Sequence, residues 1–124
     1  MRIAIDIDAT ITAYPVFFRI LTAALAGDHE IHIVTDRNPA LDEATRNLLA
    51  DLDIRYHHLA ITPDKHAYIL DHDIEVLFDD TDRYYQHLPE SVAVFKCRQH
   101  YNFDFDTGRW YYTDATGRPA PTQE

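Results

Sequence analysis

Short apolar runs alternate along this chain with stretches in which apolar residues recur at helical spacing. The apolar runs, which predict strands, cover residues 2–7, 29–35, 54–61, 74–78 and 92–95. The helical stretches between them cover about residues 15–27, 38–52, 62–70 and 83–87. Alternation of this kind is typical of βαβ units, in which helices cover both faces of a parallel sheet. The sequence therefore predicts an α/β fold.

The alternation of predicted strands and helices ends after residue 100. The stretch YNFDFDTGRWYYT alternates apolar and polar residues on both sides of Asp106–Arg109, which predicts a β-hairpin. Its aromatic side chains are too many for an exposed ribbon, so either the body of the domain or another chain should cover one face. A homodimer formed through the hairpin is the favoured interpretation.

Chain length and charge limit the classes of function. The 124 residues predict a single domain, with a core at 1–98, the hairpin at 99–114 and a frayed tail at 115–124. A net charge of −10 argues against binding duplex nucleic acid or an anionic membrane. No apolar run approaches the ~20 residues of a membrane span, and no signal-peptide pattern is present, so a cytoplasmic protein is expected.

Cysteine and histidine are common metal ligands, and their number and spacing limit the metal sites that this chain can form. Cys97 is the only cysteine, which excludes an internal disulfide and a thiolate zinc cluster. Eight histidines are scattered along the chain without an HExxH pair, so we expect no histidine metal site.

Polar residues follow three of the predicted strands. Asp6 and Asp8 follow the first, Thr35 the second, and Asp79 and Asp80 the fourth, with Lys65 at the start of the helix before the fourth strand. In an open parallel sheet, ligands bind beyond the carboxyl ends of the strands. We therefore expect these side chains to gather at one site.

The chemistry of these side chains favours a magnesium ion and a phosphoryl group. Asp6 and Asp8 are two residues apart on an extended chain, so their carboxylates should point the same way and repel each other. A cation relieves this repulsion, and oxygen ligands without thiolates suit Mg²⁺. A lysine ammonium and a threonine hydroxyl beside the ion would suit a phosphoryl group.

Four motifs in order resemble the haloacid dehalogenase superfamily of phosphatases. They are IAIDIDAT, IVTDR, TPDK and VLFDD, and the resemblance covers residues 1 to about 97. It implies a three-layer Rossmann-like fold whose five-stranded parallel sheet has the order 3-2-1-4-5. The chain departs from the pattern at Ala9, where glycine is often found.

The resemblance also implies a role for each motif residue. Asp6 would be the nucleophile that forms an aspartyl-phosphate. Asp8 would protonate the leaving group and then activate water. The phosphoryl group would be held by Thr35 and Lys65, and Mg²⁺ by Asp6, the backbone carbonyl of Asp8, Asp79 and Asp80.

The segments between the motifs are too short to contain the cap domain with which many members select small metabolites. A capless Mg²⁺-dependent phosphomonoester hydrolase is the leading hypothesis, with a nucleotide or another small phosphate ester as substrate. The alternative is a module that keeps the fold for phosphate binding, regulation or assembly, with little or no turnover. An aspartyl-phosphate receiver domain is disfavoured because the third predicted strand ends at Leu59–Ile61 without an acid.

Overall fold

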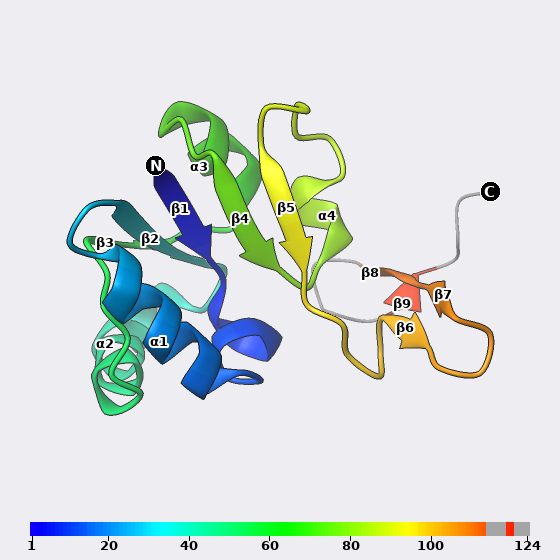
Figure 1. Ribbon diagram of the computed structural model, residues 1–124, viewed down its shortest axis with the longest axis horizontal. Helices are drawn as coiled ribbons and strands as arrows, with labels where there is room; N and C mark the ends of the chain where they lie inside the picture. Colours follow the sequence, from blue (N-terminus) through cyan, green and yellow to red (C-terminus); the bar gives the residue numbers. More distant parts are fainter. Residues whose placement is uncertain (114–118, 121–124) are drawn as a thin grey trace.

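A five-stranded, all-parallel sheet forms the centre of the computed structural model, which describes residues 1–113 and 119–120 (Figure 1). Its strands are β1 (Arg2–Ile5), β2 (Glu30–Thr35), β3 (His58–Ile61), β4 (Val76–Asp79) and β5 (Ala93–Lys96). Their order is β3-β2-β1-β4-β5, and every neighbouring pair is parallel. This confirms the predicted α/β class and the strand order.

Helices cover both faces of the sheet. The helices are α1 (Pro15–Leu25), α2 (Asp42–Asp51), α3 (Lys65–Asp71) and α4 (Asp82–Tyr85), with a short 3₁₀ helix at Pro39–Leu41. Because side chains alternate along a strand, Ile3 and Ile5 of β1 face the core beneath α1 and α2, whereas Ala4 faces the core beneath α3. Figure 1 shows α1 and α2 on one side of the sheet and α3 and α4 on the other.

Several elements begin or end a few residues from their predicted limits. β1 ends at Ile5, and a π-helical turn at Ile7–Ile11 replaces the end of the predicted strand. β3 begins at His58, because Ile54 is instead buried at the end of α2. α3 begins at Lys65 because the Asp64 side chain caps it by accepting from the Ala67 amide at 3.0 Å.

The predicted hairpin is present and lies beyond β5 in Figure 1. Its strands β6 (Phe103–Asp104) and β7 (Arg109–Trp110) are antiparallel. A second pair joins β8 (Tyr112–Thr113) to β9 (Pro119–Ala120). Residue 114 of the predicted hairpin and all of the predicted frayed tail except residues 119–120 lie outside the described residues.

None of the helices in the described part of the chain combines the length and the apolar character that crossing a membrane requires.

Candidate active site

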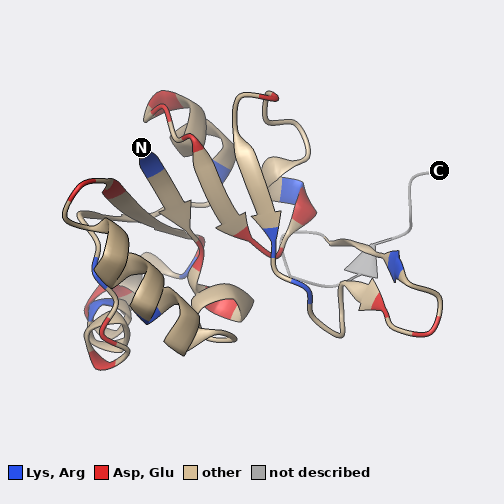
Figure 2. Cartoon of the chain, in the orientation of Figure 1, with Lys and Arg blue, Asp and Glu red and all other residues tan. Residues whose placement is uncertain are grey.

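Three acidic side chains gather where β1 and β4 end. Figure 2 colours the acidic positions of the backbone red, and some of them lie where β4 ends. The two strands are neighbours, and the Asp6 amide donates to the Phe78 carbonyl oxygen at 3.0 Å. β1 lies between β2 and β4, so its carboxyl end is the point at which the chain order of the sheet reverses. The gathering of Asp6, Asp79 and Asp80 agrees with the placement expected from the sequence.

Lys65 joins the two neighbouring strand ends. Its Nζ donates to Asp6 Oδ1 at 2.8 Å and to Asp79 Oδ2 at 3.1 Å. The lysine is 1% exposed, Asp6 5% and Asp79 0%, so the charges interact away from bulk water. One ammonium therefore faces two buried carboxylates.

The burial of these groups changes their ionisation. Desolvation, followed by repulsion from Asp79, raises the pKa of Asp6 well above its ordinary value. Desolvation also raises the pKa of Asp79, to about 6, although Lys65 acts to lower it. Burial alone would lower the pKa of Lys65, but the two carboxylates outweigh it and raise the pKa of the ammonium. Lys65 alone therefore does not stabilise both ionised carboxylates, and without a further cation the site favours a protonated carboxyl.

The loop after β4 is held by the second oxygen of Asp79. Asp79 Oδ1 accepts from the backbone amides of Asp80 and Thr81, at 2.7 and 3.0 Å. This turn directs the Asp80 side chain towards Thr10, whose hydroxyl donates to Asp80 Oδ1 at 3.4 Å and lies 3.5 Å from Asp6 Oδ2. Thr10, the threonine of the IDIDAT motif, thus bridges the carboxylates of both strands.

The C-terminal segment completes the site through contacts to Asp80 that the sequence did not predict. The Tyr101 hydroxyl donates to Asp80 Oδ2. Asn102 Nδ2 and Thr113 Oγ1 both donate to the Asp80 backbone carbonyl, at 3.3 and 3.0 Å. Burial and the bond to Asp80 raise the pKa of Tyr101, so this hydroxyl keeps its proton at neutral pH. The sequence of this segment is rich in aromatic residues, but nothing in their spacing indicates a contact with Asp80.

Asp8 is exposed and does not join the buried carboxylates, so the expectation that the Asp6 and Asp8 carboxylates point the same way and repel each other is not met. Arg37 holds it with two hydrogen bonds, at 3.0 Å from Nε and 2.8 Å from Nη2. Between Asp8 and Thr10 the backbone passes through Ala9, whose φ of 58° is in the left-handed region that favours glycine. The Ala9 carbonyl accepts from Gln99 Nε2 at 2.8 Å, so the C-terminal segment also holds this turn.

Thr35 lies at the carboxyl end of β2, beside the end of β1. Its side chain is fully buried, and its hydroxyl accepts from the Arg37 amide at 3.3 Å. The hydroxyl proton is therefore free to be donated elsewhere. The structure places Thr35 at the carboxyl end of β2, next to the carboxyl end of β1 that Asp6 follows.

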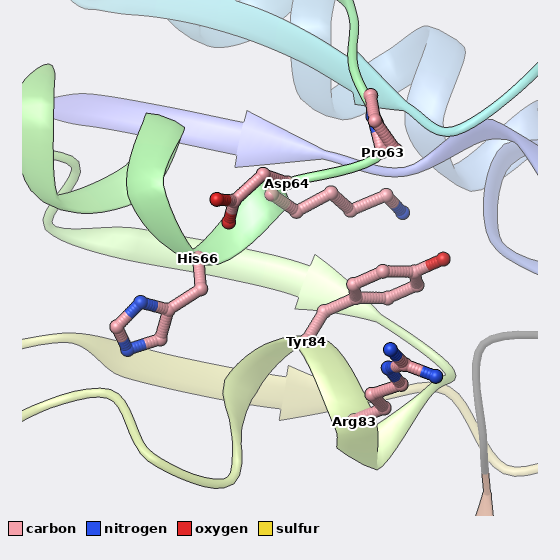
Figure 3. A pocket seen from close by; sticks show the side chains of 6 residues that line it. Pro63, Asp64, His66, Arg83 and Tyr84 are labelled. Atoms are coloured by element: carbon pink, nitrogen blue, oxygen red, sulfur yellow. The ribbon is translucent and has the colours of Figure 1, made fainter.

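A cleft of about 390 Å³ opens beside Lys65, between the start of α3 and α4. Figure 3 shows His66, Arg83 and Tyr84 around it. The Tyr84 ring lies 4.4 Å from Lys65 Nζ, and its hydroxyl donates to the Asp36 carboxylate. Tyr84 therefore separates the ammonium from the solvent in the cleft.

The donor set of the three carboxylates fits Mg²⁺. Asp6, Asp79 and Asp80 each offer an oxygen, and these oxygens lie within 4.8 Å of one another. Octahedral Mg²⁺ with bonds of about 2.1 Å sets neighbouring oxygens about 3.0 Å apart and opposite ones about 4.2 Å apart. The oxygens thus lie near the separations of such a ligand set, and a divalent cation would offset the negative charge of the ionised carboxylates.

No protein-family model, curated protein or solved structure matches the chain.

Proposed function

We propose that the chain is a Mg²⁺-dependent phosphomonoester hydrolase of the haloacid dehalogenase type. The substrate is a nucleotide or another small phosphate ester, and the reaction passes through an aspartyl-phosphate on Asp6. One observation carries the proposal: buried Lys65 joins Asp6 and Asp79 at two neighbouring strand ends, with Asp80 beside them. This arrangement supplies a nucleophilic carboxylate, oxygen ligands for a cation and a positive charge for a phosphoryl group.

The first step transfers the phosphoryl group to the protein. A carboxylate oxygen of Asp6 attacks phosphorus, and the ester P–O bond breaks. Asp8, once it has left Arg37 and taken a proton from the solvent, gives that proton to the departing oxygen, so the alcohol leaves neutral. Asp8 must first separate from Arg37, and an arriving phosphate supports this by attracting the guanidinium to itself.

The second step regenerates Asp6. Asp8, now a carboxylate, accepts a proton from a water molecule, whose oxygen attacks phosphorus. The bond between phosphorus and the Asp6 oxygen breaks, which gives inorganic phosphate and the free carboxylate. Lys65 and the Thr35 hydroxyl hold the transferring group through both steps, and bound Mg²⁺ would neutralise charge on its oxygens.

We place a remote anionic group of the substrate, and not the transferring phosphoryl group, in the cleft, because the Tyr84 ring lies between the cleft and Lys65 Nζ. Arg83 and His66 lie on the wall of the cleft, together with the acidic side chain of Asp64. A second phosphate or a carboxylate of the substrate would pair with Arg83.

The test is phosphate release from a panel of phosphomonoesters that includes nucleotides, with Mg²⁺ and with a chelator. We expect Mg²⁺-dependent release that Asp6→Asn abolishes. Asp28→Asn is the matched control, because it makes the same change at an exposed residue after α1 and should leave release unchanged. In Asp8→Asn the second step slows, so the intact mass should show one phosphoryl group retained on the protein. Equal release by Asp6→Asn and the wild type would contradict the nucleophile assignment.

A phosphate-binding module with little turnover is the second candidate. The observation that favours it is that both reactive groups are already paired: Asp8 with Arg37, and Lys65 with Asp6 and Asp79. In that case inorganic phosphate should bind in the presence of Mg²⁺, with no release from any ester of the panel.

A further inference from the structure

A second group of metal-ligating side chains lies near the amino ends of the strands, whereas Asp6 lies at their carboxyl ends. Glu30 is the first residue of β2, and His58 is the first residue of β3. His32 of β2 pairs in register with His58. Glu30 and His32 are two residues apart on one strand, so their side chains share the face that α3 covers.

The distances among these side chains approach those of a tetrahedral zinc site. Glu30 Oε1 lies 2.6 Å from His32 Nε2 and 3.3 Å from His58 Nε2. The three ligand atoms all lie within 4.8 Å of one another. Zinc bonds of about 2.0–2.2 Å place neighbouring ligand atoms about 3.3 Å apart. One distance already has this value, and a small rotation of Glu30, whose side chain is 42% exposed, lengthens the other.

A hydrogen bond at one ring nitrogen orients His32, as is usual for a histidine that ligates a metal ion. Its ring is buried, and its Nδ1 lies 2.7 Å from the Tyr68 hydroxyl, which leaves Nε2 directed at Glu30. Metal-binding histidines are commonly oriented by a hydrogen bond at the second ring nitrogen. Tyr68 is itself fixed by stacking on His72, with ring centroids 3.8 Å apart.

The cluster is open on one side. Glu30 and His58 are both partly exposed, with side-chain exposures of 42% and 53%, so an ion can enter and keep a water molecule as its fourth ligand. Two imidazoles and one carboxylate suit zinc, whereas the oxygen ligands of Asp6, Asp79 and Asp80 suit magnesium.

We propose that Glu30, His32 and His58 form a Zn²⁺ site that links β2 to the edge strand β3. The site is separate from the proposed active site, because the six residues of β2 place its two ends about 16 Å apart. It does not depend on the proposed hydrolase activity. It departs from the expectation of no histidine metal site, because residues 30, 32 and 58 form a ligand set only once β2 and β3 pair.

The test is a zinc titration of the full chain against a chromophoric chelator, with saturating Mg²⁺ present. We expect one tight Zn²⁺ per chain, and at least a tenfold loss of affinity in His58→Ala and in Glu30→Gln. Both positions are partly exposed, so these variants should fold, which circular dichroism checks. His87→Ala is the matched control, because His87 is exposed and lies outside the cluster. Asp79→Asn should also keep the zinc affinity.

Two further readouts test the geometry. Tyr68→Phe should lower the affinity about 10-fold or more without abolishing binding, because it removes only the orienting hydrogen bond. Co²⁺ in place of Zn²⁺ should give the visible absorption of a tetrahedral site, and this absorption should disappear in His58→Ala. The proposal is overturned if the wild type binds no Zn²⁺ at micromolar concentration, if His58→Ala and His87→Ala bind it equally, or if Asp79→Asn removes the binding.

Discussion

At the scale of single residues, Lys65 has the largest expected effect on stability. Replacing it with methionine leaves Asp6 and Asp79 buried without their cation. Breaking a buried ion pair in this way costs about 3–5 kcal/mol, and protonation of a carboxylate offsets part of that cost. We therefore expect Lys65→Met to lose about 3 kcal/mol in urea denaturation at pH 7 without Mg²⁺.

The other lysine of the chain provides the control. Lys96 donates to Asp82 Oδ2 at 2.7 Å, but its side chain is 15% exposed, so water compensates more of the loss. Lys96→Met should therefore cost less than Lys65→Met. Equal costs would show that the burial of Lys65 does not matter for stability.

Asp79 should make the stability of the metal-free protein depend on pH. Its pKa is about 6 in the folded chain and about 3.8 when unfolded, so the folded state binds the proton more tightly. The contribution to stability is thus fully present below the unfolded value and is lost as the pH rises through about 6. Going from pH 7 to pH 5 should stabilise the wild type relative to Asp79→Asn, since that variant has nothing to titrate at this position.

Thermal unfolding of both proteins at a series of pH values, with and without Mg²⁺, measures this difference. Mg²⁺ should raise the Tm of the wild type at pH 7 and reduce its dependence on pH, because the cation replaces the proton. If the Tm of the wild type and the Tm of Asp79→Asn depended on pH in the same way without Mg²⁺, Asp79 would not be the group responsible for the pH dependence.

The site residues divide into those that the sequence could predict and those that it could not. Asp6 and Asp79 could be predicted to meet, because parallel strands bring their carboxyl ends to one edge. Tyr101 and Thr113 could not, because no local pattern relates the hairpin to the loop after β4. For the same reason, the sequence could not predict the pairing of Asp8 with Arg37, which depends on the turn at Ala9.

At the scale of elements, α2 and α3 end in the same way. Asp53 and Asp73 follow the C-caps with φ values of 56° and 52°, in the left-handed region. After α2, the amides of Asp53 and Ile54 donate to Ala50 and Leu49. These bonds form a Schellman motif, in which glycine normally occupies the left-handed position. The sequence predicted both helices, but the rule that a glycine marks the C-terminus of a helix could not predict where these two helices end.

Glycine at these two positions should stabilise the protein. An L-residue in the left-handed region lowers the free energy of unfolding by about 1–2 kcal/mol, and glycine removes this strain. About half of the resulting gain is lost again, because glycine gives the unfolded chain more conformational entropy. Asp53→Gly and Asp73→Gly should each add about 0.5 kcal/mol to the free energy of unfolding, and the double variant about 1 kcal/mol. Urea denaturation measures the gain.

Asp51→Gly is the matched control, because Asp51 is the last residue of α2 and has helical geometry. Glycine there should destabilise the protein by about 0.2 kcal/mol, the small difference between the helix propensities of glycine and aspartate. A loss of stability in Asp53→Gly as well would show that the aspartate side chain stabilises this turn by more than its backbone strain costs.

At the scale of the whole molecule, the hairpin joins the proposed active site to an exposed aromatic surface. One end of this segment contacts Asp80 through Tyr101 and Thr113. At the other end, Phe105 is 61% exposed and Trp110 45% exposed, although both pack on Phe103. The body of the domain thus covers only part of the hairpin, which is consistent with a second copy covering the rest.

We therefore expect the chain to form a homodimer through the hairpin. Phe105→Ser removes an exposed apolar side chain from this surface without changing the core, so it should convert the dimer to a monomer. Sedimentation velocity at micromolar concentration measures the change. Leu41→Ser is the matched control, since Leu41 is 48% exposed but lies in the 3₁₀ helix before α2. If the full chain and Phe105→Ser have the same mass in solution, the hairpin is not the dimer interface, and its role is limited to holding the loop at Asp80.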